Sequence, residues 1–96
     1  MAAQTRLGDK NTGHDDCPSV SLVEASTDVF VNGIGAGRVG DHYASHSCEV
    51  HSPHSGVISA GSSSVFINGK PAGRIGDPVS CGGSVAEGSS DVYVGG

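Results

Sequence analysis

The sequence predicts an all-β domain built from three copies of one short β-hairpin. Residues 28–41 (DVFVNGIGAGRVGD) recur as residues 64–77 (SVFINGKPAGRIGD), and the two copies are identical at nine of fourteen positions. A third copy is split between the two ends of the chain, since residues 91–96 (DVYVGG) match the first arm and residues 6–9 (RLGD) match the end of the second. No long segment has the apolar spacing of an amphipathic helix.

Each copy predicts a hairpin with a tight turn. A short arm of β-branched and aromatic residues leads to Asn-Gly at 32–33 and at 68–69. This pair favours a type I′ turn, because both residues tolerate positive φ. Lead-in residues stand six positions before each first arm: Leu22, Ile58 and Val85. A unit this short cannot bury its own apolar face, so the three units are expected to pack around a common axis as one domain, residues 1–96, with pseudo-threefold symmetry.

The connections carry little regular pattern. Residues 39–55 are expected to form a long irregular segment with at most a short helical turn, and they hold four of the five histidines. With 16 Gly, two Phe and no Trp among 96 residues, the apolar core must be small. A chain of this size and composition needs an additional stabilising element, and the five His and three Cys indicate a metal.

Charge and hydropathy exclude two classes of partner. The formal net charge is −5 and no Lys/Arg cluster is present, so a nucleic-acid backbone is not a suitable ligand. No apolar run approaches the roughly 20 residues needed to span a bilayer, and the N-terminal segment lacks the apolar stretch of a secretory signal peptide. We therefore expect synthesis in the cytoplasm.

Three ligand-type residues occupy equivalent places in the repeats. His14 and His46 each stand five residues after the aspartate that closes a unit, and Cys81 stands four residues after the third such aspartate. Around a threefold axis their side chains would converge at one end, with His54 as fourth ligand and His51 as its substitute. Three imidazoles and a thiolate suit a closed, structural Zn²⁺ site. The alternatives are Fe²⁺, favoured by a larger imidazole set, and solvated histidines that bind no metal.

The remaining cysteines and the fifth histidine are interpreted separately. Cys17 and Cys48 lie close to the proposed ligands in sequence and either form a disulfide or pack as apolar thiols. His42 has no histidine counterpart in the other units, so it is predicted to be a surface residue. Each unit also ends in Arg-x-Gly-Asp, which predicts a repeated ion pair or turn-stabilising contact.

Taken together, these motifs resemble those of PAAR-repeat proteins, the spike tips of type VI secretion systems and related contractile phage tails. The naming element, Pro-Ala-Ala-Arg, corresponds to residues 71–74 (PAGR) and 35–38 (GAGR), which keep small residues where they depart from it. The resemblance covers nearly the whole chain, including residues 29–33, 46–48, 65–69, 74–82 and 91–94. It implies a small cone whose metal-stabilised apex holds zinc through His14, His46, His54 and Cys81.

The resemblance also implies a partner and a location. The triangular base would cap a trimeric β-helical spike protein, VgrG-like or the central spike of a phage, and the tip would be delivered outside the cell into a target envelope. We expect a bare tip without a fused effector, and no catalysis. The residues expected to form the partner-binding base are Val29, Val31, Val65, Ile67, Val92 and Val94.

Two other functions are considered. One is an adaptor that carries effector cargo on the spike tip, for which residues 39–55 would be the natural surface. The other is a small zinc hydrolase, in which a water replaces one ligand and Glu49 or Asp41 acts as general base.

Overall fold

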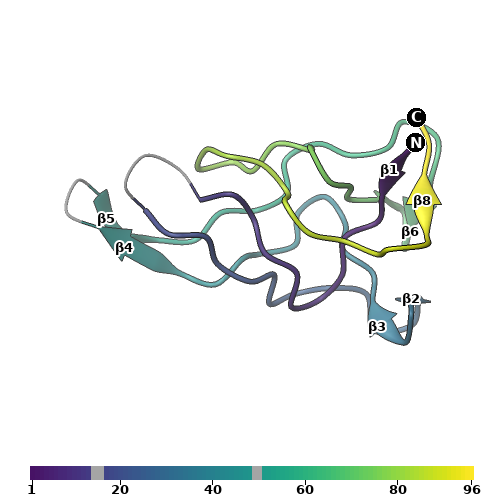
Figure 1. Cartoon of the computed structure of the whole chain (residues 1–96), viewed down its shortest axis with the longest axis horizontal. Coiled ribbons are helices and arrows are strands. Elements are labelled where there is room, and N and C mark those ends of the chain that lie inside the picture. Colours follow the sequence, from purple (N-terminus) through teal and green to yellow (C-terminus); the bar gives the residue numbers. More distant parts are fainter. Residues whose placement is uncertain (14–16, 49–50) are drawn as a thin grey trace.

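Three two-stranded hairpins form the broad end of the protein, as the computed structural model shows (Figure 1). The structure describes residues 1–13, 17–48 and 51–96, and of residues 46–48 and 51–54 it describes the backbone. The third hairpin joins the two ends of the chain, which confirms the split repeat. The antiparallel pairs are β2 (Phe30–Val31) with β3 (Ile34–Gly35), β6 (Phe66–Ile67) with β7 (Lys70–Pro71), and β8 (Tyr93–Val94) with β1 (Ala2–Ala3).

Two of these hairpins turn at the Asn-Gly pairs. Asn32 and Gly33 have φ angles of 56° and 76°, and Asn68 and Gly69 have φ angles of 54° and 78°. Positive φ at both central residues is the property of the type I′ turn, whose twist matches that of the flanking strands. The predicted hairpins and their turns are therefore confirmed.

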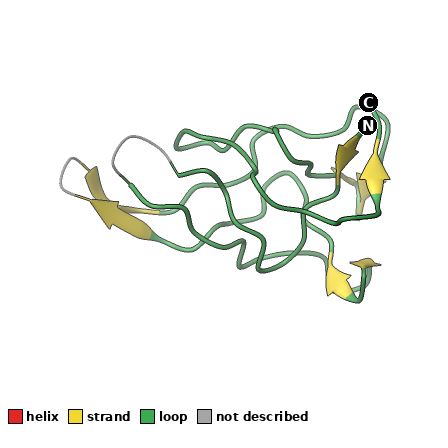
Figure 2. Ribbon diagram, viewed as in Figure 1, coloured by secondary structure: helices red, strands yellow, loops and turns green. Residues whose placement is uncertain are grey.

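A fourth hairpin lies at the opposite, narrow end of the molecule (Figures 1 and 2). It consists of β4 (His46–Cys48) and β5 (His51–His54), which pair antiparallel with a register irregularity between His46 and Cys48. The expectation of an irregular segment over residues 39–55 was thus wrong for this part. The chain has one long axis, with extents of 37 × 24 × 23 Å.

A ring of three backbone hydrogen bonds closes around the pseudo-threefold axis. The N–H of Thr5 donates to the carbonyl of Gly73, that of Gly73 to Gly37, and that of Gly37 to Thr5, at 3.0, 2.9 and 2.9 Å. A Cβ on Gly37 would lie 2.7 Å from Cγ2 of Thr5, and one on Gly73 would lie 2.9 Å from Cδ1 of Ile58. The ring therefore has room for the side chain of Thr5 and for no other.

Small apolar clusters form the core next to this ring. One cluster gathers the three lead-in residues and two neighbours, and the other lies under the base hairpins. Because each unit contributes equivalent positions to a shared interior, the units stabilise one another, as the repeat pattern predicted. The first cluster contains Leu22, Tyr43, Ile58, Val79 and Val85; the second contains Ala36, Ile67, Ala72 and Val94, with Val31 packed against it.

One unit differs from the other two at a side-chain contact. Glu24 accepts the backbone N–H of His42 at 3.0 Å, and Glu87 accepts that of Lys10 at 2.8 Å. The equivalent position to His42 and Lys10 in the remaining unit is Pro78, which has no N–H to donate. The position equivalent to Glu24 and Glu87 in that unit holds Ala60, so the hydrogen-bond donor and its acceptor are both missing there.

Helices are absent from the described residues, which are strand, turn or loop (Figure 2). The all-β prediction is confirmed. That part of the chain accordingly has no helix able to cross a membrane.

Candidate metal-bearing tip and partner-binding base

The loop that carries His14 is held at both ends by one buried asparagine. Oδ1 of Asn11 accepts the backbone N–H of Gly13 at 3.1 Å and that of Val20 at 3.0 Å. The neighbouring Thr12 pairs with Ser84 through both its backbone N–H and its hydroxyl, at 2.9 and 3.0 Å. These contacts place Thr12 and Gly13, the last described residues before His14, beside the turn that follows Cys81.

Cys81 lies against the base of the β4–β5 hairpin. The N–H of Ser80 donates to the carbonyl of Val57 at 2.8 Å, and the N–H of Val57 donates to the hydroxyl of Ser80 at 3.0 Å. This pairing sets Gly56 opposite Cys81, where a Cβ on Gly56 would lie 2.6 Å from the sulfur atom. Glycine at this position therefore lets the half-buried, free thiol approach the segment that continues from β5.

Strands β4 and β5 thus lie at the end of the protein away from the termini (Figure 1), and the contacts above place Thr12 and Cys81 toward that end. The β4–β5 register makes His46 and His54 direct Cα partners and pairs Cys48 with His51. His14 and the side chains of His46, His51 and His54 lie outside the described residues. Among the described side chains no group of three or more His, Cys, Asp or Glu is placed to hold a metal. The zinc ligands remain a prediction.

Donor chemistry and backbone placement agree with that prediction. A free thiol beside the last residues of β5 and two histidines in register on paired strands make a nitrogen and sulfur donor set, which suits Zn²⁺. The residues present therefore fit the implied metal.

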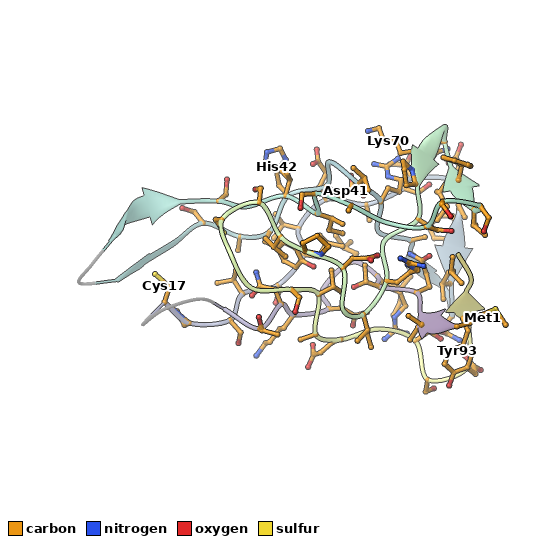
Figure 3. All side chains as sticks on the ribbon, turned by 90° about the horizontal axis from the view of Figure 1, so that it is seen from above. Met1, Cys17, Asp41, His42, Lys70 and Tyr93 are labelled. Atoms are coloured by element: carbon orange, nitrogen blue, oxygen red, sulfur yellow. The ribbon has the colours of Figure 1, made fainter. Side chains whose placement is uncertain are left out.

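Cys17 and His42 are two residues that the sequence left outside the proposed ligand set. Cys17, seen near the narrow end in Figure 3, is buried and disulfide-bonded. The side chain of Cys48, for which a disulfide and a packed thiol were the two alternatives, lies outside the described residues. His42 is a surface residue, as predicted: its side chain is half exposed and its Nδ1 lies 2.8 Å from Oε1 of Glu24. The hydrogen bonds from His42 lower the pKa of Glu24.

The repeated Arg-x-Gly-Asp segments form three equivalent ion pairs, as predicted. In each, the aspartate accepts the arginine's backbone N–H and two of its guanidinium N–H groups. Hydrogen bonding to the carboxylate raises the pKa of each arginine. The shortest distances are 3.0 Å for Arg6 to Asp9, 2.8 Å for Arg38 to Asp41 and 2.9 Å for Arg74 to Asp77.

The ion pair with Arg38 also bears on the possible role of Asp41 as the general base of a zinc hydrolase. Its side chain is 1% exposed and is engaged by Arg38 through both carboxylate oxygens. No pocket opens beside it in the described part of the chain. Glu49, the other candidate base, lies outside the described residues.

The partner-binding base, at the broad end of the protein, exposes a different set of residues from the one expected. Ile67 and Val94 are only 7% and 8% exposed and pack in the core, as Val31 does in part. Of the predicted set, Val29 and Val65 are exposed, and Val92 is half-buried. The neighbouring position of each hairpin carries an exposed aromatic ring that the sequence analysis missed. These base aromatics are Phe30, Phe66 and Tyr93, with 58%, 58% and 53% of their surface exposed.

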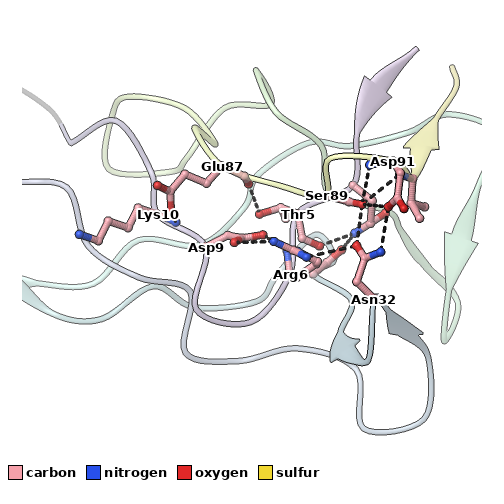
Figure 4. A network of polar contacts seen from close by, with 11 residues as sticks. Thr5, Arg6, Asp9, Lys10, Asn32, Glu87, Ser89 and Asp91 are labelled. Carbon is pink, nitrogen blue, oxygen red and sulfur yellow. Dashed lines mark hydrogen bonds and ion pairs between the residues drawn. The ribbon is translucent and has the colours of Figure 1, made fainter.

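Polar contacts join neighbouring hairpins at the rim of the base. Asn32 donates through Nδ2 to Asp91 at 2.8 Å, and its Oδ1 accepts from Arg6 at 3.1 Å and from Ser89 at 2.6 Å (Figure 4). We call this set the first seam clasp. The same pattern recurs as the second seam clasp, in which Asn68 contacts Asp28, Arg38 and Ser26 at 2.8, 3.0 and 2.7 Å.

At the third seam, backbone carbonyl groups replace the asparagine. The carbonyl of Gly95 accepts from Ser62 at 2.6 Å and from Arg74 at 3.2 Å. The position equivalent to Asp28 and Asp91 holds Ser64. The backbone of the base therefore repeats three times, whereas the asparagine contacts occur at two of its three seams.

Comparison with known families agrees with this architecture. The family model described as PAAR motif matches residues 7–87. The chain therefore belongs to the PAAR-motif family, a structural family of spike-tip proteins in contractile injection systems. Proteins of this family are secretion or tail components and are associated with VgrG spikes. No curated protein matches the sequence.

Proposed function

We propose that this protein is the structural tip that caps and sharpens a trimeric β-helical spike, and that it performs no catalysis. The observation that carries the proposal is the base: three hairpins of one chain present exposed aromatic rings at equivalent positions. A chain with internal pseudo-threefold symmetry offers three similar surfaces to a partner with true threefold symmetry. One asymmetric chain can thus terminate a three-chain fibre.

Aromatic side chains are suited to this contact. They bury a large apolar area at low conformational cost and are enriched among the residues that dominate binding energies. Three exposed rings on the hairpins of one end support an interaction site there, since large apolar side chains gathered on a surface mark such sites. The base aromatics lie at the end opposite the predicted metal site (Figure 1), so binding and piercing would use opposite ends of the long axis.

The experiment that tests the base is binding to a purified trimeric β-helical spike of a contractile injection system. Phe66→Asp places a charge on the base, and we expect its affinity to fall by at least about tenfold. The matched control is Val23→Asp, since Val23 is 57% exposed and lies outside the base hairpins. Both variants should keep the thermal stability of the parent. Equal binding by the two variants would place the partner surface elsewhere.

The narrow end is proposed to hold one structural zinc ion. His14, His46, His54 and Cys81 would hold it, with His51 as the substitute for His54, and Fe²⁺ as the lesser alternative. Bound zinc would join segments that are far apart in sequence and would stabilise the folded state directly. With four protein ligands no position is left for a reacting water, so the site would stiffen the tip without catalysis.

A further inference from the structure

Two of the three base hairpins turn at an Asn-Gly sequence on the protein surface. Asn32 and Asn68 are exposed and adopt positive φ, and each is followed by a glycine. Asn-Gly is the dipeptide most prone to deamidation, because glycine has no side chain to hinder attack by its own backbone nitrogen on the preceding amide. The third hairpin has Gly95 at the equivalent position and lacks the reactive group.

Each of these amides is held by three side chains from outside its own turn. For Asn32, Asp91 accepts from Nδ2 at 2.8 Å, while Ser89 and Arg6 donate to Oδ1 at 2.6 and 3.1 Å (Figure 4). Cyclisation requires Cγ to swing toward the nitrogen of Gly33. That movement must break the contacts to both Asp91 and Arg6, so the first seam clasp opposes the reaction.

We propose that Asn32 and Asn68 are deamidation sites that the two seam clasps hold inactive in the folded protein. When a clasp opens, the backbone nitrogen of the following glycine loses its proton to solvent and attacks Cγ of the asparagine. The Cγ–Nδ2 bond breaks, and the amide nitrogen takes up a proton from solvent and leaves as ammonia. Water then opens the resulting succinimide at either of its two C–N bonds, giving aspartate or isoaspartate.

The product cannot rebuild the clasp. In the native clasp, Nδ2 of Asn32 lies 2.8 Å from Oδ1 of Asp91. A carboxylate at position 32 would bring two negative charges this close, and they would repel each other. Isoaspartate would in addition lengthen the backbone of a two-residue turn. A seam that opens long enough to react would therefore stay weakened, and the reaction would mark that hairpin permanently.

The chain itself supplies a suitable variant for the test. Ser64 stands where the other units have Asp28 and Asp91, and its N–H donates to Ser62 at 3.1 Å as that of Asp91 donates to Ser89 at 3.2 Å. Asp91→Ser should therefore preserve the local backbone while removing the acceptor of Asn32. Asp28→Ser does the same for Asn68 and serves as the matched control.

The experiment follows the loss of amide by mass spectrometry during incubation of the purified full chain at mildly alkaline pH. After reduction, trypsin cleavage after Lys10, Arg38 and Arg74 separates the two asparagines into different peptides. In the parent protein both sites should react at least about tenfold more slowly than in the urea-unfolded chain. Asp91→Ser should speed the reaction several-fold at Asn32 alone, and Asp28→Ser at Asn68 alone.

Two results would overturn the proposal. One is a folded parent protein that reacts as fast as the unfolded chain. The other is a folded Asp91→Ser variant in which the two asparagines keep their parent rates, or accelerate together. If circular dichroism shows that Asp91→Ser has lost its fold, Asp28→Ser tests the same mechanism at the second seam clasp, where Asn68 should accelerate relative to Asn32. Equal rates in that variant would contradict the clasp mechanism.

Discussion

The backbone N–H of Gly37 donates to the carbonyl oxygen of Thr5 at 2.9 Å, and the side chain of Thr5 occupies the space that a side chain on Gly37 would need. Gly37→Ala would set its Cβ 2.7 Å from Cγ2 of Thr5 and 2.8 Å from Cδ2 of Leu22. Overpacking of this kind costs about 1–3 kcal/mol of unfolding free energy. Urea unfolding measures the loss, and adding Thr5→Ser, which removes the clashing methyl, should restore part of it.

The control for that substitution is Gly95→Ala. The nearest heavy atom to a Cβ on Gly95 is Sδ of Met1 at 3.5 Å, which is ordinary contact. Its stability should match that of the parent. If Gly37→Ala is as stable as Gly95→Ala, the axial ring, formed by the backbone hydrogen bonds of Thr5, Gly37 and Gly73, does not limit side-chain size.

Tyr43 carries a buried hydroxyl without a hydrogen-bond partner among the described residues. Burial, with smaller contributions from Asp9 and Asp77, raises the pKa of this phenol. Because the hydroxyl is desolvated and unpaired, Tyr43→Phe should leave stability unchanged or raise it by up to about 1 kcal/mol. Thermal unfolding checks this expectation, and a clear loss of stability would show that the hydroxyl has a partner.

The seam clasps predict how stability depends on acid. Hydrogen bonds from Asn68 and then Ser26 lower the pKa of Asp28, and those from Asn32 and then Ser89 lower the pKa of Asp91, from an ordinary value of 3.8. The folded state therefore favours the charged carboxylates. Their contribution is fully present above the unfolded pKa and is lost as the pH falls through the lower folded values.

Urea unfolding at a series of pH values tests this dependence. The unfolding free energy should decline as the pH falls below 3.8. In the double variant Asp28→Ser, Asp91→Ser the decline should be shallower. Parallel curves for parent and variant would mean that these carboxylates have the same pKa in the folded and unfolded states.

Metal content tests the narrow end. Elemental analysis of protein purified without a metal-binding tag should find one zinc per chain. Cys81→Ala should lose the metal and unfold at a markedly lower temperature, because binding to the native state stabilises it. His42→Ala is the control, since that exposed histidine pairs with Glu24 and stands outside the proposed ligands. Loss of zinc from His42→Ala, or its retention in Cys81→Ala, would require another ligand set.

Thiol labelling gives an independent measurement of the same site. The thiol of Cys81 is free in the structure, so it should react with an alkylating agent once a chelator has removed the metal. Before chelation, a thiolate bound to zinc should be protected. Equal labelling with and without the chelator would show that Cys81 does not bind the metal.

The hairpins were predictable because their signals are local. The Asn-Gly pairs at 32–33 and 68–69 fix the turns through φ alone, and the matching ends of the chain disclosed the split repeat. The burial of Val31, Ile67 and Val94 was not anticipated, because Val31 and Phe30 are adjacent apolar residues and alternation alone does not say which of the two turns inward. Packing decides it: the interior beneath the base is shared with Ala36 and Ala72, and it takes aliphatic side chains at positions 31, 67 and 94.

The strand pair at the narrow end could not be predicted from the sequence, for a related reason. Residues 46–48 (HSC) and 51–54 (HSPH) contain no apolar alternation, so nothing in their sequence indicated a strand pair. The equivalence of His14, His46 and Cys81 came from counting along the repeats. Spacing along a chain can place residues at one end of a fold, whereas their coordination depends on side-chain positions that counting does not supply.

The axial ring suggests why this tip is one chain and not an assembly of three short ones. Three identical subunits would have to place either three threonines or three glycines on their common axis. The first arrangement has no room, and the second leaves the centre without a side chain. Joining the units in a single polypeptide lets one of them supply Thr5 while the other two supply Gly37 and Gly73. A single chain thus allows the three axial positions to carry different residues.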